Sequence, residues 1–193
     1  MRHGETMGAE PGKLYGQTNV ALSAQGIEQS RRLAEHLVTK NLAAVYSSDL
    51  QRASAGAEMI AARHHLDVHY SSAWREINMG QWERKRIAEL NEAEPDRVAE
   101  LFNDPASFQY PGGESFAVFI NRIHRELRWL LARHDNGEVA LVTHAGVCRV
   151  IIGQALHMPA AVWLRLAQAA GCLNVIDWRD SYPVLEAMNH RDF

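Results

Sequence analysis

The stretch Glu138-Val-Ala-Leu-Val-Thr143 is a continuous, mostly apolar run that ends directly at His144-Ala145-Gly146. Such a run predicts a strand buried on both faces, as in a parallel sheet. Asn136-Gly137 supplies a turn before it, and the residues from His144 to about Leu156 are expected to form a helix. A strand that leads into a helix is the repeating unit of an α/β protein.

The same alternation extends in both directions along the chain. Ser23 and Ser115 are placed to cap the first turns of two helices, and Pro95 interrupts a third. The expected strands cover residues 42–46, 67–70, 138–143, 173–178 and 184–188, and the expected helices cover 23–38, 50–65, 86–102, 115–133 and 144–156. The last two strands are expected to pair across a turn near Ser181-Tyr182-Pro183. This order predicts a three-layer α/β/α fold with a mostly parallel central sheet.

Length and composition indicate a single domain over residues 1–193. Hydrophobic residues make up 47% and charged residues 22%, which excludes a disordered chain. The formal net charge of -3 predicts no general attraction to nucleic acid or to an acidic membrane surface. Cys148 and Cys172, in a chain without an apolar signal peptide or a run of about 18 apolar residues, indicate a reduced cytoplasmic protein with buried thiols.

The oligomeric state is left open between monomer and homodimer. Trp163, Leu164 and Leu166 would suit either the core or a dimer face, and we favour the core.

Chemistry-bearing residues follow the expected strands. Ligands of such sheets bind beyond the carboxyl ends of the strands, where His144 follows one end and Arg52 lies one turn into the helix after another. Arg2-His3-Gly4-Glu5-Thr6 opens the chain, and its glycine permits a close backbone approach. A lone histidine beside glycine is more often structural. Two histidines and two arginines at one edge would form a cationic pocket in a negatively charged chain, and phosphate is its natural occupant.

Several stretches together resemble the histidine phosphatase superfamily, the phosphoglycerate mutase-like proteins. Arg2-His3-Gly4-Glu5-Thr6 is similar to its signature, and Ser47-Ser48-Asp49-Leu50-Gln51-Arg52-Ala53 to its Ser-Asp-Leu-x-Arg-Ala motif. The other matching stretches are Tyr15 to Ser23 with Gly26, Glu76 with Gly80-Gln81-Trp82-Glu83, Pro111 to Ser115, and Thr143 to Gly146. They stand in family order from residue 2 to about 176. The resemblance implies a phosphoglycerate mutase-like fold.

The resemblance also implies a role for each matched residue. His3 would be the nucleophile that takes the phosphoryl group, and Arg2, Arg52 and His144 would hold its oxygens. Glu76 would donate a proton to the leaving alcohol and take one from water. Further substrate contacts are expected at Gly4, Gln17, Thr18 and Ala145. Neither a metal nor a cofactor is required.

Two physical conditions accompany these roles. The attacking nitrogen of His3 must be unprotonated, so we expect the other ring nitrogen to donate to a backbone carbonyl. A nearby phosphate should raise the pKa of Glu76, which must be protonated in the first step. The alternative for Glu76 is a surface acid beside Arg75.

The sequence departs from the family in three places. Only Met1 and Arg2 precede His3, where the family has a central strand of about five apolar residues. The nucleophile would then lie on a fraying terminus, so we expect a missing N-terminal segment or a terminus held in another way, and favour the first. Ala9 stands where many relatives have an asparagine that donates to phosphate, a role that Gln17 or Thr18 could fill. Arg84 stands where a glycine commonly follows the glutamate.

The leading hypothesis is a phosphomonoesterase that hydrolyses a small metabolite phosphate through a phosphohistidine. The segment from Met7 to Tyr15-Gly16-Gln17-Thr18 resembles the α-ribazole phosphatase branch, which implies α-ribazole 5'-phosphate as the substrate. A phosphoglycerate mutase is a second hypothesis, although the chain lacks obvious room for substrate-closing insertions. The third is a non-catalytic module that binds a phospho-ligand, and the presence of His3, Glu76 and His144 argues against it. Specificity is expected in the irregular region 78–110.

Overall fold

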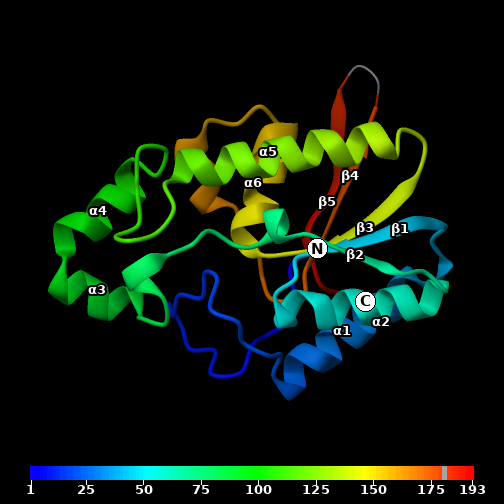
Figure 1. The fold of residues 1–193 in the computed structure, drawn as a ribbon, viewed down its shortest axis with the longest axis horizontal. Helices are drawn as coiled ribbons and strands as arrows, with labels where there is room; N and C mark the ends of the chain where they lie inside the picture. Colours follow the sequence, from blue (N-terminus) through cyan, green and yellow to red (C-terminus); the bar gives the residue numbers. More distant parts are fainter. Residues whose placement is uncertain (180–181) are drawn as a thin grey trace.

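A three-stranded parallel sheet forms the centre of the computed structural model (Figure 1). β1 (Leu42–Ser47) lies between β2 (Val68–Tyr70) and β3 (Glu138–Val142), and both pairings are parallel. The three strands follow the sequence expectation to within a residue at either end. The structure describes residues 1–179 and 182–193.

An antiparallel pair of strands forms a second, separate sheet. β4 (Leu173–Trp178) pairs with β5 (Pro183–His190), as the sequence predicts. The turn expected between them near Ser181 falls partly on Asp180 and Ser181, which lie outside the described residues.

Helices follow the strands in the expected order. They are α1 (Ala24–His36), α2 (Gln51–His64), α3 (Ile87–Ala93), α4 (Pro95–Asn103), α5 (Phe116–Arg133) and α6 (Ala145–Ala155), with 3-10 turns at Leu37–Thr39, Ser72–Trp74, Gly80–Trp82 and Ala160–Arg165. The hydroxyls of Ser23 and Ser115 accept from the N–H groups of Gly26 and Val118, so both expected caps are confirmed. None of the helices in the described ranges is long and apolar enough to span a membrane.

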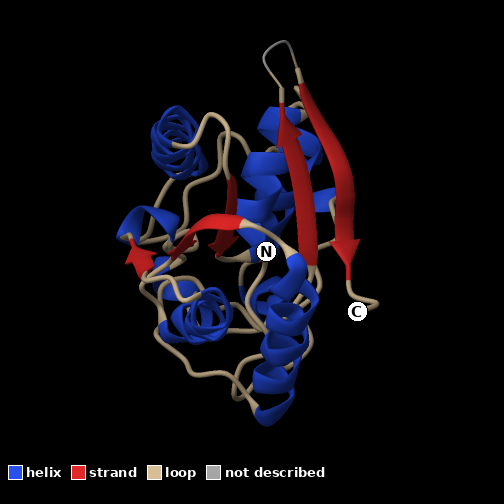
Figure 2. Cartoon of the chain, turned by 90° about the vertical axis from the view of Figure 1, so that its right-hand side faces the viewer, coloured by secondary structure: helices blue, strands red, loops and turns tan. Residues whose placement is uncertain are grey.

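The helices cover both faces of the parallel sheet, as Figure 2 shows. Successive side chains of a strand point to opposite faces, and β1 follows this rule. Val45 packs with α1 and α2, whereas Ala44 and Tyr46 pack with the cluster that contains α5 and α6. The three-layer α/β/α class is therefore confirmed.

One detail of the first helix differs from the sequence pattern. Leu33, Ala34 and Leu37 are buried, but Ile27 and Val38 are 48% and 49% exposed. The chain passes into a 3-10 turn at Leu37, which rotates Val38 away from the expected stripe. The helical pattern therefore predicted the element correctly and part of its buried face wrongly.

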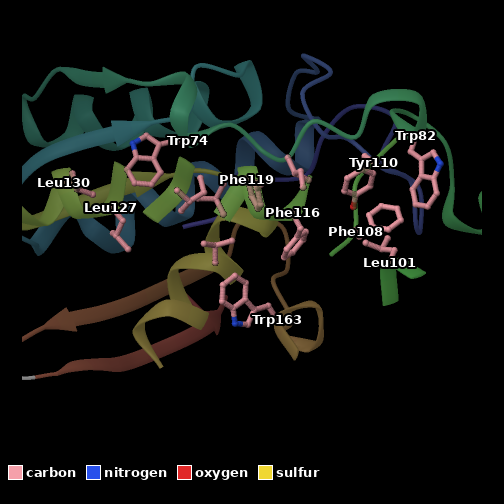
Figure 3. Close-up of a cluster of buried hydrophobic side chains, with 14 of the residues drawn as sticks. Trp74, Trp82, Leu101, Phe108, Tyr110, Phe116, Phe119, Leu127, Leu130 and Trp163 are labelled. Atoms are coloured by element: carbon pink, nitrogen blue, oxygen red, sulfur yellow. The ribbon is translucent and has the colours of Figure 1, made fainter. Parts of the chain in front are cut away.

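Buried aromatic residues hold the irregular region against the main core (Figure 3). The ring of Trp82 lies 5.4 Å from that of Phe108 and 5.6 Å from that of Tyr110, measured between centroids. Trp163 is also buried in this cluster, so its assignment to the core is confirmed. The segment that carries Glu76 and Glu83 is thus fixed by packing and is not a free loop.

The two cysteines are buried and unpaired, as expected. Burial raises the pKa of the Cys148 thiol, which disfavours the reactive thiolate.

The first three residues are held from both sides. On one side, the N–H of His3 donates to Thr143 O at 2.9 Å and the N–H of Thr143 donates to Met1 O at 2.9 Å. On the other, the N–H of Arg2 donates to Cys172 O at 3.0 Å and the N–H of Gly171 donates to His3 O at 2.9 Å. The terminus therefore does not fray, because it pairs with the end of β3 and with the residues just before β4.

Candidate active site

His3 lies at the carboxyl end of the parallel sheet, beside the end of β3, and is 8% exposed. Its Nδ1 is 2.7 Å from the carbonyl oxygen of Gly4. A carbonyl only accepts, so Nδ1 carries the proton and Nε2 keeps a free lone pair. The expectation that a backbone carbonyl fixes the tautomer of His3 is confirmed.

Gly4 permits a close approach between two backbone segments. A Cβ atom at this position would lie 2.3 Å from the carbonyl oxygen of Gly26, at the start of α1. Any larger residue would push the segment that carries His3 away from this helix, as the sequence suggested.

His144 and Arg52 meet His3 in one buried cluster. The two imidazole rings are 5.1 Å apart between centroids, and Nε of Arg52 is 3.2 Å from both His3 Nε2 and His144 Nδ1. His144 Nε2 lies 2.9 Å from the hydroxyl of Ser48. His144 is the residue that precedes α6, and Arg52 is the second residue of α2. The strand ends thus bring together the side chains that the sequence placed there.

Arg52 also anchors the loop from Tyr15 to Thr18. Its terminal nitrogens donate to Thr18 O at 2.8 Å and to Gly16 O at 2.6 Å. Arg52 is 1% exposed, so its guanidinium is enclosed by these carbonyls and by the two imidazoles. A lysine could supply the charge but not this planar set of donors.

Glu83 closes the same loop from the other side. Its carboxylate accepts from the N–H groups of Gly16, Gln17 and Thr18 at 3.1, 2.7 and 3.1 Å, and from the Thr18 hydroxyl at 2.6 Å. Burial alone would raise the pKa of Glu83, but these donors together hold it below its usual value. The carboxylate therefore acts as a fixed clamp.

The clamp bears on two expected substrate contacts. The N–H and hydroxyl of Thr18 are both occupied by Glu83, and Gln17 Nε2 donates to the carbonyl of Glu76 at 3.2 Å. In this structure Glu83 takes up the donors of Thr18, and the Glu76 carbonyl takes up one of the two N–H donors of the Gln17 side chain.

Glu76 is buried next to this loop: it is 6% exposed, and its backbone carbonyl accepts from Gln17 Nε2. Its carboxylate accepts from the N–H of Gly146 at 2.9 Å and from its neighbour Ile77 at 3.0 Å. A Cβ atom on Gly146 would lie 2.2 Å from Glu76 Oε1, so only glycine leaves room for this contact. Ala145 is the first residue of α6, next to this position. Glu76 is therefore not a surface acid beside Arg75, whose guanidinium pairs with Asp49 instead.

Arg122 was missed by the sequence analysis. It donates to the carbonyls of Ala73 and Arg75 at 2.8 and 2.9 Å, and it pairs with Glu114 at 2.8 Å. These bonds hold the segment that leads into Glu76. Nothing in the local pattern of α5 distinguishes this arginine, because the two carbonyls that it binds lie 47 and 49 residues away along the chain.

Arg2 lies near the cluster, because its charge helps to lower the pKa values of both His3 and His144. One terminal nitrogen donates to the carbonyl of Gln168, while its buried Nε has no partner among the described residues. Burial lowers the pKa of Arg2, and the nearby carboxylate of Glu76 opposes that shift. One buried donor of Arg2 is thus left without an acceptor among the described residues.

Burial and nearby positive charges favour the neutral form of both imidazoles. Burial, followed by the charges of Arg52 and Arg2, holds the pKa of His3 well below 6.5. Burial and Arg52 do the same to the pKa of His144. Burial lowers the pKa of Arg52 to about 10, which still leaves it charged at neutral pH. The cluster therefore combines neutral imidazoles with fixed cations, an arrangement suited to the oxygens of a phosphoryl group.

The model of the histidine phosphatase superfamily (branch 1) matches residues 1–191. The chain belongs to the histidine phosphatase superfamily. Among curated histidine phosphatase relatives, "Probable phosphoglycerate mutase GpmB" of Salmonella choleraesuis (strain SC-B67) is 30% identical over 181 residues, which cover 94% of this chain and 84% of that protein.

Solved structures of similar fold have been reported as phosphatases. The α-ribazole phosphatase of Shigella flexneri superposes with a TM-score of 0.88 at 28% identity, covering 99% of this chain and 95% of that one. The mycobacterial glucosyl-3-phosphoglycerate phosphatase gives a TM-score of 0.87 at 25% identity, covering 97% and 95%. A phosphoserine phosphatase mutant of Entamoeba histolytica in complex with phosphoserine gives 0.88 at 26% identity, covering 99% and 95%.

Proposed function

We propose that this histidine phosphatase superfamily member is a phosphomonoesterase that works through a phosphohistidine at Nε2 of His3. The observation that carries the proposal is the unprotonated Nε2 of His3, with the Arg52 guanidinium 3.2 Å away. Nothing in the described cluster has to be deprotonated before attack, and the cation stands where negative charge develops.

The first half-reaction transfers the phosphoryl group to the enzyme. Nε2 of His3 attacks phosphorus, and the bond from phosphorus to the ester oxygen breaks. Protonated Glu76 gives its proton to the leaving alcohol, while Arg52, His144 and Arg2 bind the phosphoryl oxygens.

The second half-reaction releases phosphate. A water attacks the phosphohistidine and gives a proton to the Glu76 carboxylate, and the bond from phosphorus to nitrogen breaks. His3 returns to its neutral form with Nδ1 still held by Gly4. The N–H of Gly146, two residues after His144, holds the Glu76 carboxylate at 2.9 Å, which supports the same role for Glu76 in both steps.

The proposed substrate is a small metabolite phosphate. The solved relatives include phosphatases named for α-ribazole, glucosyl-3-phosphoglycerate and phosphoserine, and we take α-ribazole 5'-phosphate as the first candidate. The name of the curated relative favours phosphoglycerate mutase as a second candidate function.

The test measures phosphate release from p-nitrophenyl phosphate, α-ribazole 5'-phosphate, phosphoserine and 3-phosphoglycerate. We expect hydrolysis by the unaltered chain and only background turnover by His3→Ala. Interconversion of phosphoglycerates without phosphate release would support the mutase instead. Turnover by neither chain, with phosphate binding retained, would overturn both enzymatic proposals and leave a binding module.

A further inference from the structure

Arg149 is a half-buried arginine of α6 that forms no ion pair in the described part of the chain. Its Nε donates to the carbonyl oxygen of Leu166 at 2.9 Å. Its two terminal nitrogens have no hydrogen-bond partner among residues 1–179 and 182–193, and they are not among the fully buried polar atoms that lack a partner. They therefore stay accessible to solvent or to a ligand.

The other described arginines that are not exposed have partners or belong to the catalytic cluster. Three of them pair with a carboxylate: Arg75 with Asp49, Arg97 with Glu100 and Arg122 with Glu114. The remaining two, Arg2 and Arg52, lie at His3, where a phosphoryl group is proposed to bind. Removing a charge from water without a counter-ion costs free energy. Within the described ranges, Arg149 is thus the one such arginine outside the cluster that lacks an anionic partner.

The backbone of α6 places Arg149 beside Glu76. The N–H of Gly146 donates to the Glu76 carboxylate at 2.9 Å, and Arg149 follows three residues later on the same face of the helix. Side chains of a helix lean toward its N-terminus, so Arg149 covers the turn that starts at Gly146. Its guanidinium therefore lies near the carboxyl proposed to protonate the leaving alcohol.

A second connection joins Arg149 to the cluster. The carbonyl of Leu166, which Arg149 binds, is two residues from the carbonyl of Gln168, which accepts from Arg2. Burial lowers the pKa of Arg2, the Glu76 carboxylate opposes that shift, and the charge of Arg149 adds a smaller lowering. Both arginines thus lie in one region with Glu76.

The hydroxyl of Tyr110 reaches the same region. The Tyr110 ring packs edge-on against Trp82 and Phe108, at 5.6 and 5.1 Å between centroids (Figure 3). Its oxygen has no hydrogen-bond partner in the described structure and is not a fully buried atom, so it is open to a ligand. Burial and the Glu76 carboxylate raise the pKa of Tyr110, while Arg149 lowers it. The hydroxyl therefore stays protonated and can donate.

A guanidinium with free donors and a phenolic hydroxyl together suit a carboxylate. If Arg52, His144 and Arg2 hold the phosphoryl oxygens, the leaving alcohol lies at Glu76, and a group attached to that alcohol extends toward Arg149. One guanidinium balances the single charge of a carboxylate, whereas a second phosphate would bring more negative charge than it can balance.

We propose that Arg149 and Tyr110 form a second anion subsite, which binds a carboxylate carried by the leaving alcohol. This inference rests on the proposed function, because the role of Glu76 places that alcohol. The substrate class is a phosphate ester of a hydroxy acid or of a hydroxy amino acid. Phosphoserine and 3-phosphoglycerate carry such a carboxylate and α-ribazole 5'-phosphate does not, so the subsite places the first two ahead of it. Arg149 selects the substrate and takes no part in bond breaking.

The experiment measures binding in a His3→Ala background, in which no phosphohistidine can form. Two pairs of ligands differ in the carboxylate: phosphoserine with phosphoethanolamine, and 3-phosphoglycerate with glycerol 3-phosphate. Isothermal titration calorimetry gives the Kd of each ligand for the background chain and for Arg149→Met, Arg149→Lys and Tyr110→Phe. Arg125→Met is the matched control, because it removes the same charge from an exposed position of α5.

We expect the background chain to bind each carboxylate ligand at least about tenfold more tightly than its partner, as a hydrogen-bonded charge pair allows. Arg149→Met should weaken the carboxylate ligands by about 10- to 100-fold and their partners by less than about threefold. Arg149→Lys should keep part of the preference, because it retains the charge but not the planar donors. Tyr110→Phe should lose a smaller part, and it leaves the bond from Arg149 to Leu166 in place. Arg125→Met should change nothing.

An unchanged preference in Arg149→Met and Tyr110→Phe would overturn the proposal. An equal loss for both members of each pair would do the same, because it would indicate a general effect on the fold or the field. A third pair, fructose 1,6-bisphosphate with fructose 6-phosphate, tests a second phosphate. Dependence on Arg149 in that pair alone would overturn the assignment to a carboxylate.

Turnover is measured separately, with the unaltered chain and p-nitrophenyl phosphate, which has no carboxylate. Absent turnover with the binding preference intact would count against the proposed function alone. Turnover without a binding preference would count against the subsite alone.

Discussion

Nε of Arg52 donates to Nε2 of His3 at 3.2 Å. The guanidinium, which is 1% exposed, is thus hydrogen-bonded to the nitrogen proposed to attack phosphorus. This contact does two things. It marks Nε2 as the acceptor nitrogen. The charge of Arg52 also helps to lower the pKa of His3, which favours the neutral imidazole. An incoming phosphoryl group would take over the donor, so the same guanidinium is positioned to bind the reacting group.

Replacing Arg52 by lysine should lower kcat by about 10²- to 10³-fold, as loss of a preorganised donor does in other enzymes. Lysine keeps a charge but cannot reach the imidazoles and the carbonyls of Gly16 and Thr18 together. Steady-state hydrolysis of p-nitrophenyl phosphate measures the effect. Arg191→Lys, at an exposed position, is the matched control, and equal activity of the two variants would contradict the assigned role.

Glu76→Gln should lower kcat by about 10²- to 10⁴-fold for alkyl phosphates, because the amide has no proton to give to the leaving alcohol. The loss should be much smaller for p-nitrophenyl phosphate, whose leaving group is stable without a proton. Glutamine can still accept from the N–H of Gly146, so the fold of the segment is kept. The exposed Glu92→Gln serves as control. An equal loss on both substrates would count against a proton-donor role.

Glu83→Gln should loosen the loop from Tyr15 to Thr18, since the amide brings a donor to a place surrounded by N–H groups. We expect the free energy of unfolding to fall by about 1–3 kcal/mol and KM to rise through Arg52, which the loop holds. Thr18→Val removes one of these donors and should produce a smaller change of the same kind. Denaturant unfolding and steady-state kinetics measure both, and an unchanged KM in Glu83→Gln would exclude the link to Arg52.

Stability should fall in mild acid because of the two buried imidazoles. The folded pKa values of His3 and His144 lie well below 6.5, so below this pH the unfolded chain binds more protons than the folded one. Their contribution is complete above about pH 6.5 and declines as the pH drops, by about 1.4 kcal/mol per pH unit for each histidine. Urea unfolding between pH 8 and pH 5 measures this slope.

His144→Gln should reduce that slope by about one histidine's share. His65→Asn is the matched control, because His65 is exposed and adopts φ 56°, which asparagine tolerates. Identical slopes in the two variants would show that His144 does not titrate as the structure implies.

Most elements could be predicted because their determinants are local. The cap at Ser115 and the stripe of Phe119, Ile123 and Leu127 define α5 without reference to any other part of the chain. Pro95 separates α3 from α4 for the same kind of reason. The pattern was less reliable in predicting which side chains of a helix are buried, because burial depends on the elements packed against it. Ile27, expected on the buried stripe of α1, is exposed.

The departure at Arg84 shows how local strain is accommodated. Arg84 adopts φ 67°, which lies in the left-handed region that glycine reaches without steric cost. Arginine occupies it here because Arg84 N and Lys85 O both bond to Leu14, which holds the backbone in place. The sequence marked the position as unusual, but only the structure shows the conformation that made it so.

The sequence by itself determined the order of strands and helices, and with it the meeting of His3, Arg52 and His144, because the carboxyl ends of parallel strands share one edge of a sheet. Only the tertiary structure decided how that cluster is held, through the bonds of Glu83 to the loop that Arg52 contacts and the bonds of Arg122 to the segment before Glu76. Such contacts join residues far apart in the chain, and their partners are chosen by the way the layers stack, which no local pattern records.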